Sequence, residues 1–176
     1  MHDQFETLNY LIDGNERQKH AYAILNDHQI LEKLHAYQPL LTGTVPIGID
    51  IETSDLDIIC CYTDAKQFND FVILSFSGYE SFTTRNAVVN GNGVIVANFY
   101  IENWEIEIFG QSLPTKQQHA YLHMIAEYKL LQHYGESLRK KVIQLKQEGY
   151  KTEPAFGMAL GLKGNPYEEL LKLIIY

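Results

Sequence analysis

The chain has little of several residue types, and each shortage excludes a class of protein. It has only two cysteines, Cys60 and Cys61. Adjacent side chains in a strand point to opposite faces, so we expect two reduced, buried thiols and no disulfide. No apolar run approaches the roughly 20 residues that a membrane-spanning helix needs. The first ten residues show neither the basic nor the apolar region of a signal peptide, so the cytoplasm is the expected compartment, with no membrane partner.

Basic residues are also scarce. The chain has 14 Lys and Arg against 22 Asp and Glu, a formal net charge of −8 and a pI near 5.3. A general nucleic-acid binder needs a basic stripe that displaces counterions from phosphates, so a long nucleic acid is not an expected partner. At 45% hydrophobic residues, with 12 Tyr and 8 Phe among 176 residues, the chain is long and apolar enough for one ordered globular core.

Hydrophobic periodicity and turn residues predict a helix–strand–strand–helix order, then three strands and a helical tail. The predicted helices cover 4–36, with breaks at Gly14-Asn15 and Asn26-Asp27, and then 63–77, 115–134, 136–148, 153–161 and 166–175. The predicted strands cover 40–42, 54–62, 80–89, 94–101 and 104–109. This order indicates an α+β fold: a core over 1–114 that includes the N-terminal helices, and a helical segment over 115–176 packed on it as one compact unit.

The most informative stretch is Asp55-Leu56-Asp57. In a strand, the two aspartates share one face, with α-carbons about 6.6 Å apart, so both carboxylates can lean onto one divalent cation. No basic residue lies between Thr42 and Ala65 to neutralise them. A cation is therefore the expected partner, although a strand with one solvated face would give the same pattern.

Two sets of motifs carry a family resemblance. Gly43-Thr44, ten further residues and Asp55-Leu56-Asp57-Ile58 resemble the signature of the nucleotidyltransferase superfamily. The segments Gly-Thr-Val-Pro-Ile, Ser-Asp-Leu-Asp-Ile, Trp-Glu-Ile-Glu-Ile-Phe-Gly-Gln and Thr-Glu-Pro-Ala-Phe also resemble the bacterial family called domain of unknown function 4269, which is grouped with nucleotidyltransferase-like folds.

The resemblance implies a nucleotidyltransferase-like mixed β-sheet with flanking helices and a C-terminal helical segment. It also implies that Gly43 and Thr44 hold a nucleoside triphosphate and that Asp55 and Asp57 bind Mg²⁺. Glu107 is then the third carboxylate, as a further metal ligand or as general base, with Glu105 on the same strand face as its alternate. The implied reaction is Mg²⁺-dependent transfer of a nucleoside monophosphate from a nucleoside triphosphate to an unidentified hydroxyl acceptor, small or macromolecular.

The chain departs from the superfamily pattern in the spacer over 45–54, which holds acidic residues and no base. Arg85, in a strand predicted to join the same sheet, is the expected replacement, with Lys116 and Lys129 as further candidates. A solvated surface arginine is the competing interpretation.

A second set of candidates lies in the helical tail, where His119, His123 and Glu127 are spaced at i, i+4 and i+8 and form one stripe of a helix. This stripe could contact a metal, or a base or sugar in a cleft between the sheet and the tail. Helical stripes of this kind are more often packed or solvated. The Thr-Glu-Pro-Ala-Phe segment is expected to serve packing, with Thr152 capping a helix and Phe156 buried.

Two alternatives to nucleotidyl transfer stay open. One is an inactive binding or regulatory module of the same fold that pairs with a protein partner, as some small relatives do in toxin–antitoxin systems, and the base-free spacer favours it. The other is a metal-dependent phosphoesterase that uses the same carboxylates.

Overall fold

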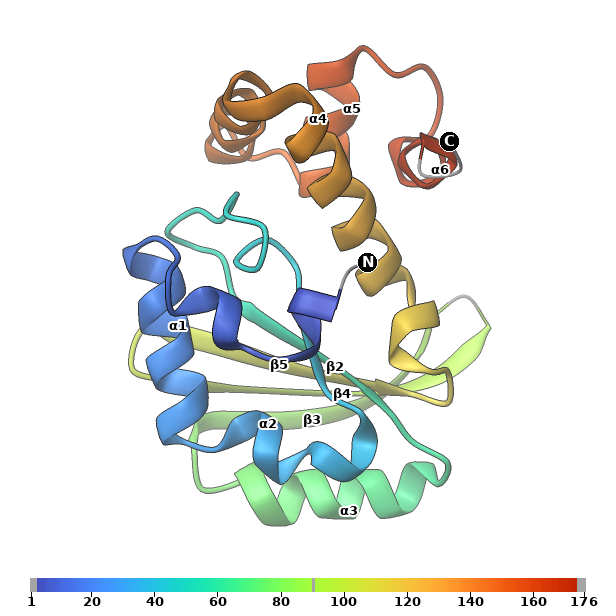
Figure 1. Ribbon diagram of the computed structural model, residues 1–176. Helices are drawn as coiled ribbons and strands as arrows, with labels where there is room; N and C mark the ends of the chain where they lie inside the picture. The colour runs from blue at the N-terminus through green and yellow to red at the C-terminus, as the bar shows by residue number, and fades with distance from the viewer. Residues whose placement is uncertain (1–2, 90, 174–176) are drawn as a thin grey trace.

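The computed structural model describes residues 3–89 and 91–173, in which a five-stranded sheet lies between two groups of helices (Figure 1). The strands are β1 (Leu40–Thr42), β2 (Leu56–Cys61), β3 (Glu80–Val89), β4 (Asn92–Ile101) and β5 (Trp104–Gln111). The helices are α1 (Glu16–Asp27), α2 (Ile30–Lys33), α3 (Ala65–Phe76), α4 (His119–Gln147), α5 (Thr152–Leu160) and α6 (Pro166–Lys172). Short 3₁₀ turns cover Asp3–Glu6, Asn9–Leu11, His35–Tyr37 and Thr115–Gln117.

The sheet is mixed, with the strand order β1-β2-β5-β4-β3. β2 and β5 are parallel neighbours, whereas the β1/β2, β5/β4 and β4/β3 pairs are antiparallel. The parallel pair brings together two strands that are far apart in the sequence. It therefore sets the Asp55-Leu56-Asp57 stretch beside the later Glu-Ile-Glu strand.

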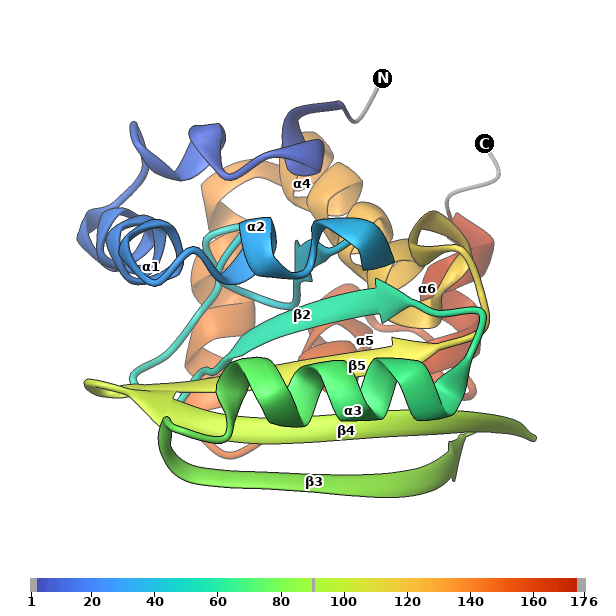
Figure 2. The ribbon, with the colours of Figure 1, turned by 90° about the horizontal axis from the view of Figure 1, so that it is seen from below.

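Each face of the sheet has its own apolar core. Helices α1 to α3 cover one face of the sheet (Figure 2). The core on this face includes Ile58, Ile106 and Phe99. α3 packs so closely that a Cβ at Gly110 of β5 would lie 2.1 Å from the Phe68 ring. The second core contains Ile59 of β2 and buried residues from α4, α5 and α6. The alternation predicted for β5 is confirmed, because its even-numbered apolar side chains are buried and its glutamates are half-buried on the other face.

Helix α4 changes direction at Gly135, whose φ of 67° and ψ of −156° are not helical. The predicted division into two helices near this glycine is therefore confirmed.

The predicted start of the last helix is also confirmed, since the Asn165 side chain accepts a hydrogen bond from the Tyr167 backbone N–H and Pro166 is the first helical residue. The part of that prediction beyond Leu173 lies outside the described residues. No helix in the described ranges combines the length and apolarity that crossing a membrane requires.

Three local predictions are wrong. The first helix begins only at Glu16, where Asn15 and Gln18 form a reciprocal capping box. The segment before it forms 3₁₀ turns, because so few residues cannot offset the cost of nucleating a helix. β2 begins at Leu56 and not at Ser54, because the Ser54 hydroxyl accepts a hydrogen bond from the Ile51 N–H inside a turn. Thr152 is the first residue inside α5 and makes no cap, since Lys151 occupies the capping position.

Candidate functional site

Three carboxylates from two neighbouring strands face one cavity. Asp57 of β2 is the register partner of Glu107 of β5, so the two side chains project to the same face of the sheet. Asp55 lies directly before β2 and lines the same cavity. All three line a cavity of about 780 Å³, whose opposite wall is made by residues of α4 and α5. The structure thus brings together the three carboxylates that the sequence singled out.

Glu105, the alternate to Glu107, is not among the residues that line the cavity. The Tyr100 hydroxyl donates a hydrogen bond of 3.1 Å to Glu105 Oε2. Asn98 Nδ2 lies 3.1 Å from Glu105 Oε1 and 3.2 Å from Glu107 Oε2 and bridges the two glutamates. Glu107 is therefore the better placed of the pair.

Gly43 lies directly after β1, against the aspartates. Its φ of +81° favours glycine, and a Cβ built on it would stand 2.4 Å from Asp57 Oδ2. Gly43 and Thr44 both line the cavity, and the Thr44 hydroxyl donates a hydrogen bond of 3.3 Å to Ser54 Oγ. This hydrogen bond joins the two ends of the spacer, so the spacer folds into a closed loop beside the carboxylates.

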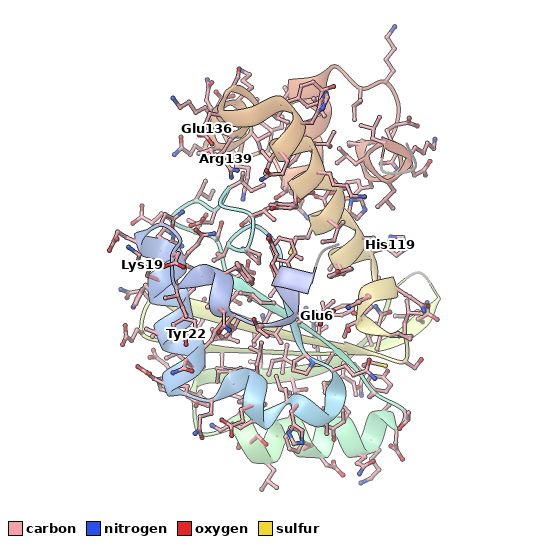
Figure 3. The ribbon with its side chains drawn as sticks, viewed as in Figure 1. Glu6, Lys19, Tyr22, His119, Glu136 and Arg139 are labelled. Atoms are coloured by element: carbon pink, nitrogen blue, oxygen red, sulfur yellow. The ribbon has the colours of Figure 1, made fainter. Side chains whose placement is uncertain are left out.

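Basic side chains from α4 hold this spacer loop. Arg139 Nη1 donates to the carbonyl oxygens of Ile47 and Gly48, at 2.5 and 2.8 Å. Figure 3 shows Arg139 and Glu136 on the part of α4 near this loop and His119 at the other end of the helix. Lys146 Nζ donates to the Ile49 carbonyl oxygen at 2.9 Å. The helical tail therefore positions the loop that carries Gly43 and Asp55.

Lys146 is a basic residue of the cavity wall that does not stand out in the sequence. Only 7% of its surface is exposed, it lines the cavity, and burial lowers its pKa while nearby acids such as Asp50 and Glu127 oppose that shift. The sequence gives a weak indication that Lys146 is buried, because it follows Val142 by one helical turn on the buried stripe of α4. Arg85, the expected replacement, is exposed and does not line the cavity. Its Nη1 donates to Asn98 at 3.1 Å, and its charge opposes the rise in the pKa of Glu107. Lys116 pairs with Glu6.

The carboxylates destabilise one another's charged forms. Burial, followed by the charges of Asp55 and Glu107, raises the pKa of Asp57 from 3.8 to about 8. Burial also raises the pKa of Asp55 and of Glu107. Three half-buried acids with one nearby ammonium make a site in which a bound cation would relieve both repulsion and desolvation.

A second group of metal-competent side chains lies on the cavity wall formed by α4 and α5. One ring nitrogen of His123 and one carboxylate oxygen each of Glu127 and Glu153 lie within 4.8 Å of one another. Burial raises the pKa of both glutamates and lowers that of His123, which the neighbouring His119 lowers further. Glu153 belongs to the Thr-Glu-Pro-Ala-Phe segment that was assigned to packing. The structure confirms packing for the buried Phe156 but adds a polar position at Glu153.

Comparison with solved structures identifies the fold. A structure of the Cid1 poly(U) polymerase with Mg 3′-dATP bound is similar with a TM-score of 0.56 and 13% identity, over 91% of this chain and 54% of that one. A structure of the GLD-2/RNP-8 complex is similar with a TM-score of 0.53 and 12% identity, over 90% of this chain and 60% of that one. The protein therefore has a nucleotidyltransferase-like fold, and it spans about half to three fifths of the length of these chains.

The family follows from the sequence match. The family model described as Domain of unknown function (DUF4269) matches residues 23–173, and the chain belongs to this family. No curated protein matches the sequence.

Proposed function

We propose that the protein is a Mg²⁺-dependent nucleotidyltransferase that moves a nucleoside monophosphate from a nucleoside triphosphate to a hydroxyl acceptor. One observation carries the proposal: Asp55, Asp57 and Glu107 line a single cavity directly beside the Gly43 turn. Carboxylates alone fit many hydrolytic reactions. Carboxylates next to a turn whose backbone is open to a phosphate group favour phosphoryl chemistry.

The donor set fits Mg²⁺. Asp55, Asp57 and Glu107 offer only carboxylate oxygens, the ligands that Mg²⁺ prefers, and the cavity leaves room for the water and phosphate oxygens that complete its coordination. When bound, the ion would neutralise and orient the phosphate oxygens. The raised pKa of Asp57 means that part of the free energy of metal binding removes a proton from this group.

Binding of the triphosphate is assigned to two parts of the cavity wall. Gly43 and Thr44 offer backbone N–H groups and a hydroxyl, and Lys146 offers the positive charge that the spacer lacks. With Lys146 present, the base-free spacer no longer argues for an inactive module.

The chemical step needs a base as well as a metal. The acceptor oxygen forms a bond to the α-phosphorus, the bond from that phosphorus to the oxygen bridging to the β-phosphate breaks, and pyrophosphate leaves. The acceptor proton passes to a carboxylate, a role open to Glu107 because it lines the cavity beside the two aspartates. The net charge of −8 favours a small acceptor over a long nucleic acid.

Transfer is tested with nucleoside triphosphates labelled at the α-phosphate. The protein is incubated with each nucleotide, Mg²⁺ and pools of hydroxylated small molecules, and the labelled products are separated. Label appearing in an acceptor, with loss of the product in Asp57→Asn, supports the proposal. Free labelled monophosphate alone would favour a phosphoesterase, and an unchanged nucleotide would favour a binding module with a protein partner.

A further inference from the structure

The cavity contains a second cluster that nucleotidyl transfer does not use. His123 and Glu127 are four residues apart and share one face of α4, and Glu153 comes from the first turn of α5. Their ligand atoms lie within 4.8 Å of one another. Zn²⁺ ligands lie about 2.0–2.2 Å from the ion, so shifts of under about 1 Å would bring all three atoms onto one ion.

His123 also has a buried ring nitrogen without a hydrogen-bond partner in the described part of the chain, on a side chain that lines the cavity. This nitrogen is Nδ1, and only 7% of the His123 surface is exposed. Native proteins rarely leave a buried polar nitrogen unpaired without a reason.

The two glutamates point to a cation as the missing partner. Glu127 is 4% exposed, and the charge of Glu153 adds to burial in raising its pKa. Lys146 lowers the pKa of Glu127, and its ammonium donates one hydrogen bond to the Ile49 carbonyl oxygen. Glu127 is buried and Glu153 is half-buried, so two close carboxylates beside an imidazole supply three ligands for a metal ion.

We propose that His123, Glu127 and Glu153 form a binding site for a divalent transition metal, with Zn²⁺ as its representative ion. The imidazole selects against Mg²⁺, which prefers oxygen ligands only, and two carboxylates with one imidazole suit Zn²⁺ or Mn²⁺. Three protein ligands leave a coordination position open, and this position faces the cavity that also holds the aspartates. The site is separate from the Asp55, Asp57 and Glu107 group and can be filled without any nucleotide.

The test measures Zn²⁺ affinity by competition with a chromophoric chelator, using the metal-free full chain. Glu153→Gln, which alters a half-buried side chain, and His123→Ala are each expected to weaken binding at least about 100-fold, since even outer-shell partners are worth about 10- to 100-fold. Glu168→Gln is the matched control, because it also removes an acid from the first turn of a helix in the tail but lies outside the cavity. Its affinity is expected to equal that of the wild type.

Two further measurements separate this site from other ligands. Co²⁺ in place of Zn²⁺ is expected to give visible d–d bands without a thiolate charge-transfer band, which excludes Cys60 and Cys61 as ligands. Asp57→Asn is expected to keep its Zn²⁺ affinity but to lose Mg²⁺-dependent nucleotide binding. The Zn²⁺ site and the nucleotide site are therefore tested independently of each other. Zn²⁺ binding that is absent in the wild type, unchanged in Glu153→Gln, or lost in Asp57→Asn overturns the proposal.

Discussion

Gly43 and Asp57 are so close that a single added methyl group would collide with the carboxylate, since a Cβ at position 43 would stand 2.4 Å from Asp57 Oδ2. The contact joins the end of β1 to β2, where Thr42 is the register partner of Asp57. The turn assigned to phosphate binding and the residue assigned to metal binding are therefore one structural unit.

The first prediction concerns this contact. Gly43→Ala is expected to lower the free energy of unfolding by about 2–4 kcal/mol, because it adds left-handed backbone strain and a steric clash. It should also abolish Mg²⁺-dependent nucleotide binding, since the Asp57 carboxylate must move. Thermal unfolding and nucleotide titration check the two effects.

Gly91→Ala is the control for backbone strain. Gly91 has a similar φ of +78°, but an added Cβ would meet nothing within 4 Å. Gly91→Ala should lower the free energy of unfolding by only about 1–2 kcal/mol and leave nucleotide binding unchanged. Equal losses of binding in both variants would show that the Gly43–Asp57 contact is irrelevant to the site.

The second prediction is that removing a charge from the site stabilises the metal-free protein. Asp57→Asn keeps the shape of the side chain but removes a buried group that Asp55 and Glu107 repel. Each unit of raised pKa corresponds to about 1.4 kcal/mol, so a gain of at least about 2 kcal/mol at pH 8 is expected, or about 4–8 °C in Tm. Calorimetric unfolding in the presence of a chelator measures this gain in stability. Asp13→Asn, at an exposed position, is the control. A lower Tm for Asp57→Asn than for the wild type would contradict the prediction.

The third prediction is a pH dependence of stability in the metal-free protein. The unfolded Asp57 carboxyl ionises near pH 3.8, whereas the folded one holds its proton up to about pH 8. Between these values the folded state binds more protons at Asp57, so the stability that this group contributes is fully present below about pH 3.8 and is lost as the pH rises toward about 8. Asp55 and Glu107 add to the same trend because their pKa values are also raised.

Urea unfolding at a series of pH values measures this trend. Asp57→Asn should show a shallower fall in stability than the wild type over the same window. Equal slopes in the two proteins would mean that Asp57 is not the group whose proton is lost.

The fourth prediction concerns the buried lysine. Lys146→Met keeps an aliphatic side chain but leaves the Ile49 carbonyl oxygen without its donor and the cavity without this positive charge. Nucleotide affinity is expected to fall at least about tenfold, since a hydrogen bond to a charged group is worth about 1.5–3 kcal/mol. Lys140→Met, at an exposed position of the same helix, should bind nucleotide as the wild type does, and a matching loss there would point to a nonspecific charge effect.

Much of the fold could be predicted from the sequence because local signals agreed with the tertiary structure. The alternation in β5, the Asn165-Pro166 start of α6 and the break at Gly135 all depend on neighbours within a few residues. The prediction of a helix for the first residues is wrong, because their apolar spacing is helical but the segment before Asn15 is too short to sustain a helix. The cost of nucleating a helix decided that case.

The candidate site could be predicted only in part, because some of its residues come together only in the tertiary structure. Asp55, Asp57 and Gly43 lie within one motif, and strand alternation placed Glu107 on a shared face. Lys146 and Glu153 reach the cavity only because α4 and α5 fold back over the sheet, and no local pattern reports that contact. Arg85 was chosen from its strand alone, and its exposure follows from the position of β3 at the edge of the sheet.

The most direct test of the account is a calorimetric titration of ATP, GTP, CTP and UTP into the wild type and into Asp55→Asn/Asp57→Asn, each with and without Mg²⁺. The account predicts binding of at least one nucleotide by the wild type with Mg²⁺ only, and none by the double variant. Binding that survives without Mg²⁺ or without both aspartates would contradict the assignment of these carboxylates to the metal, and no binding at all would contradict the nucleotidyltransferase proposal itself.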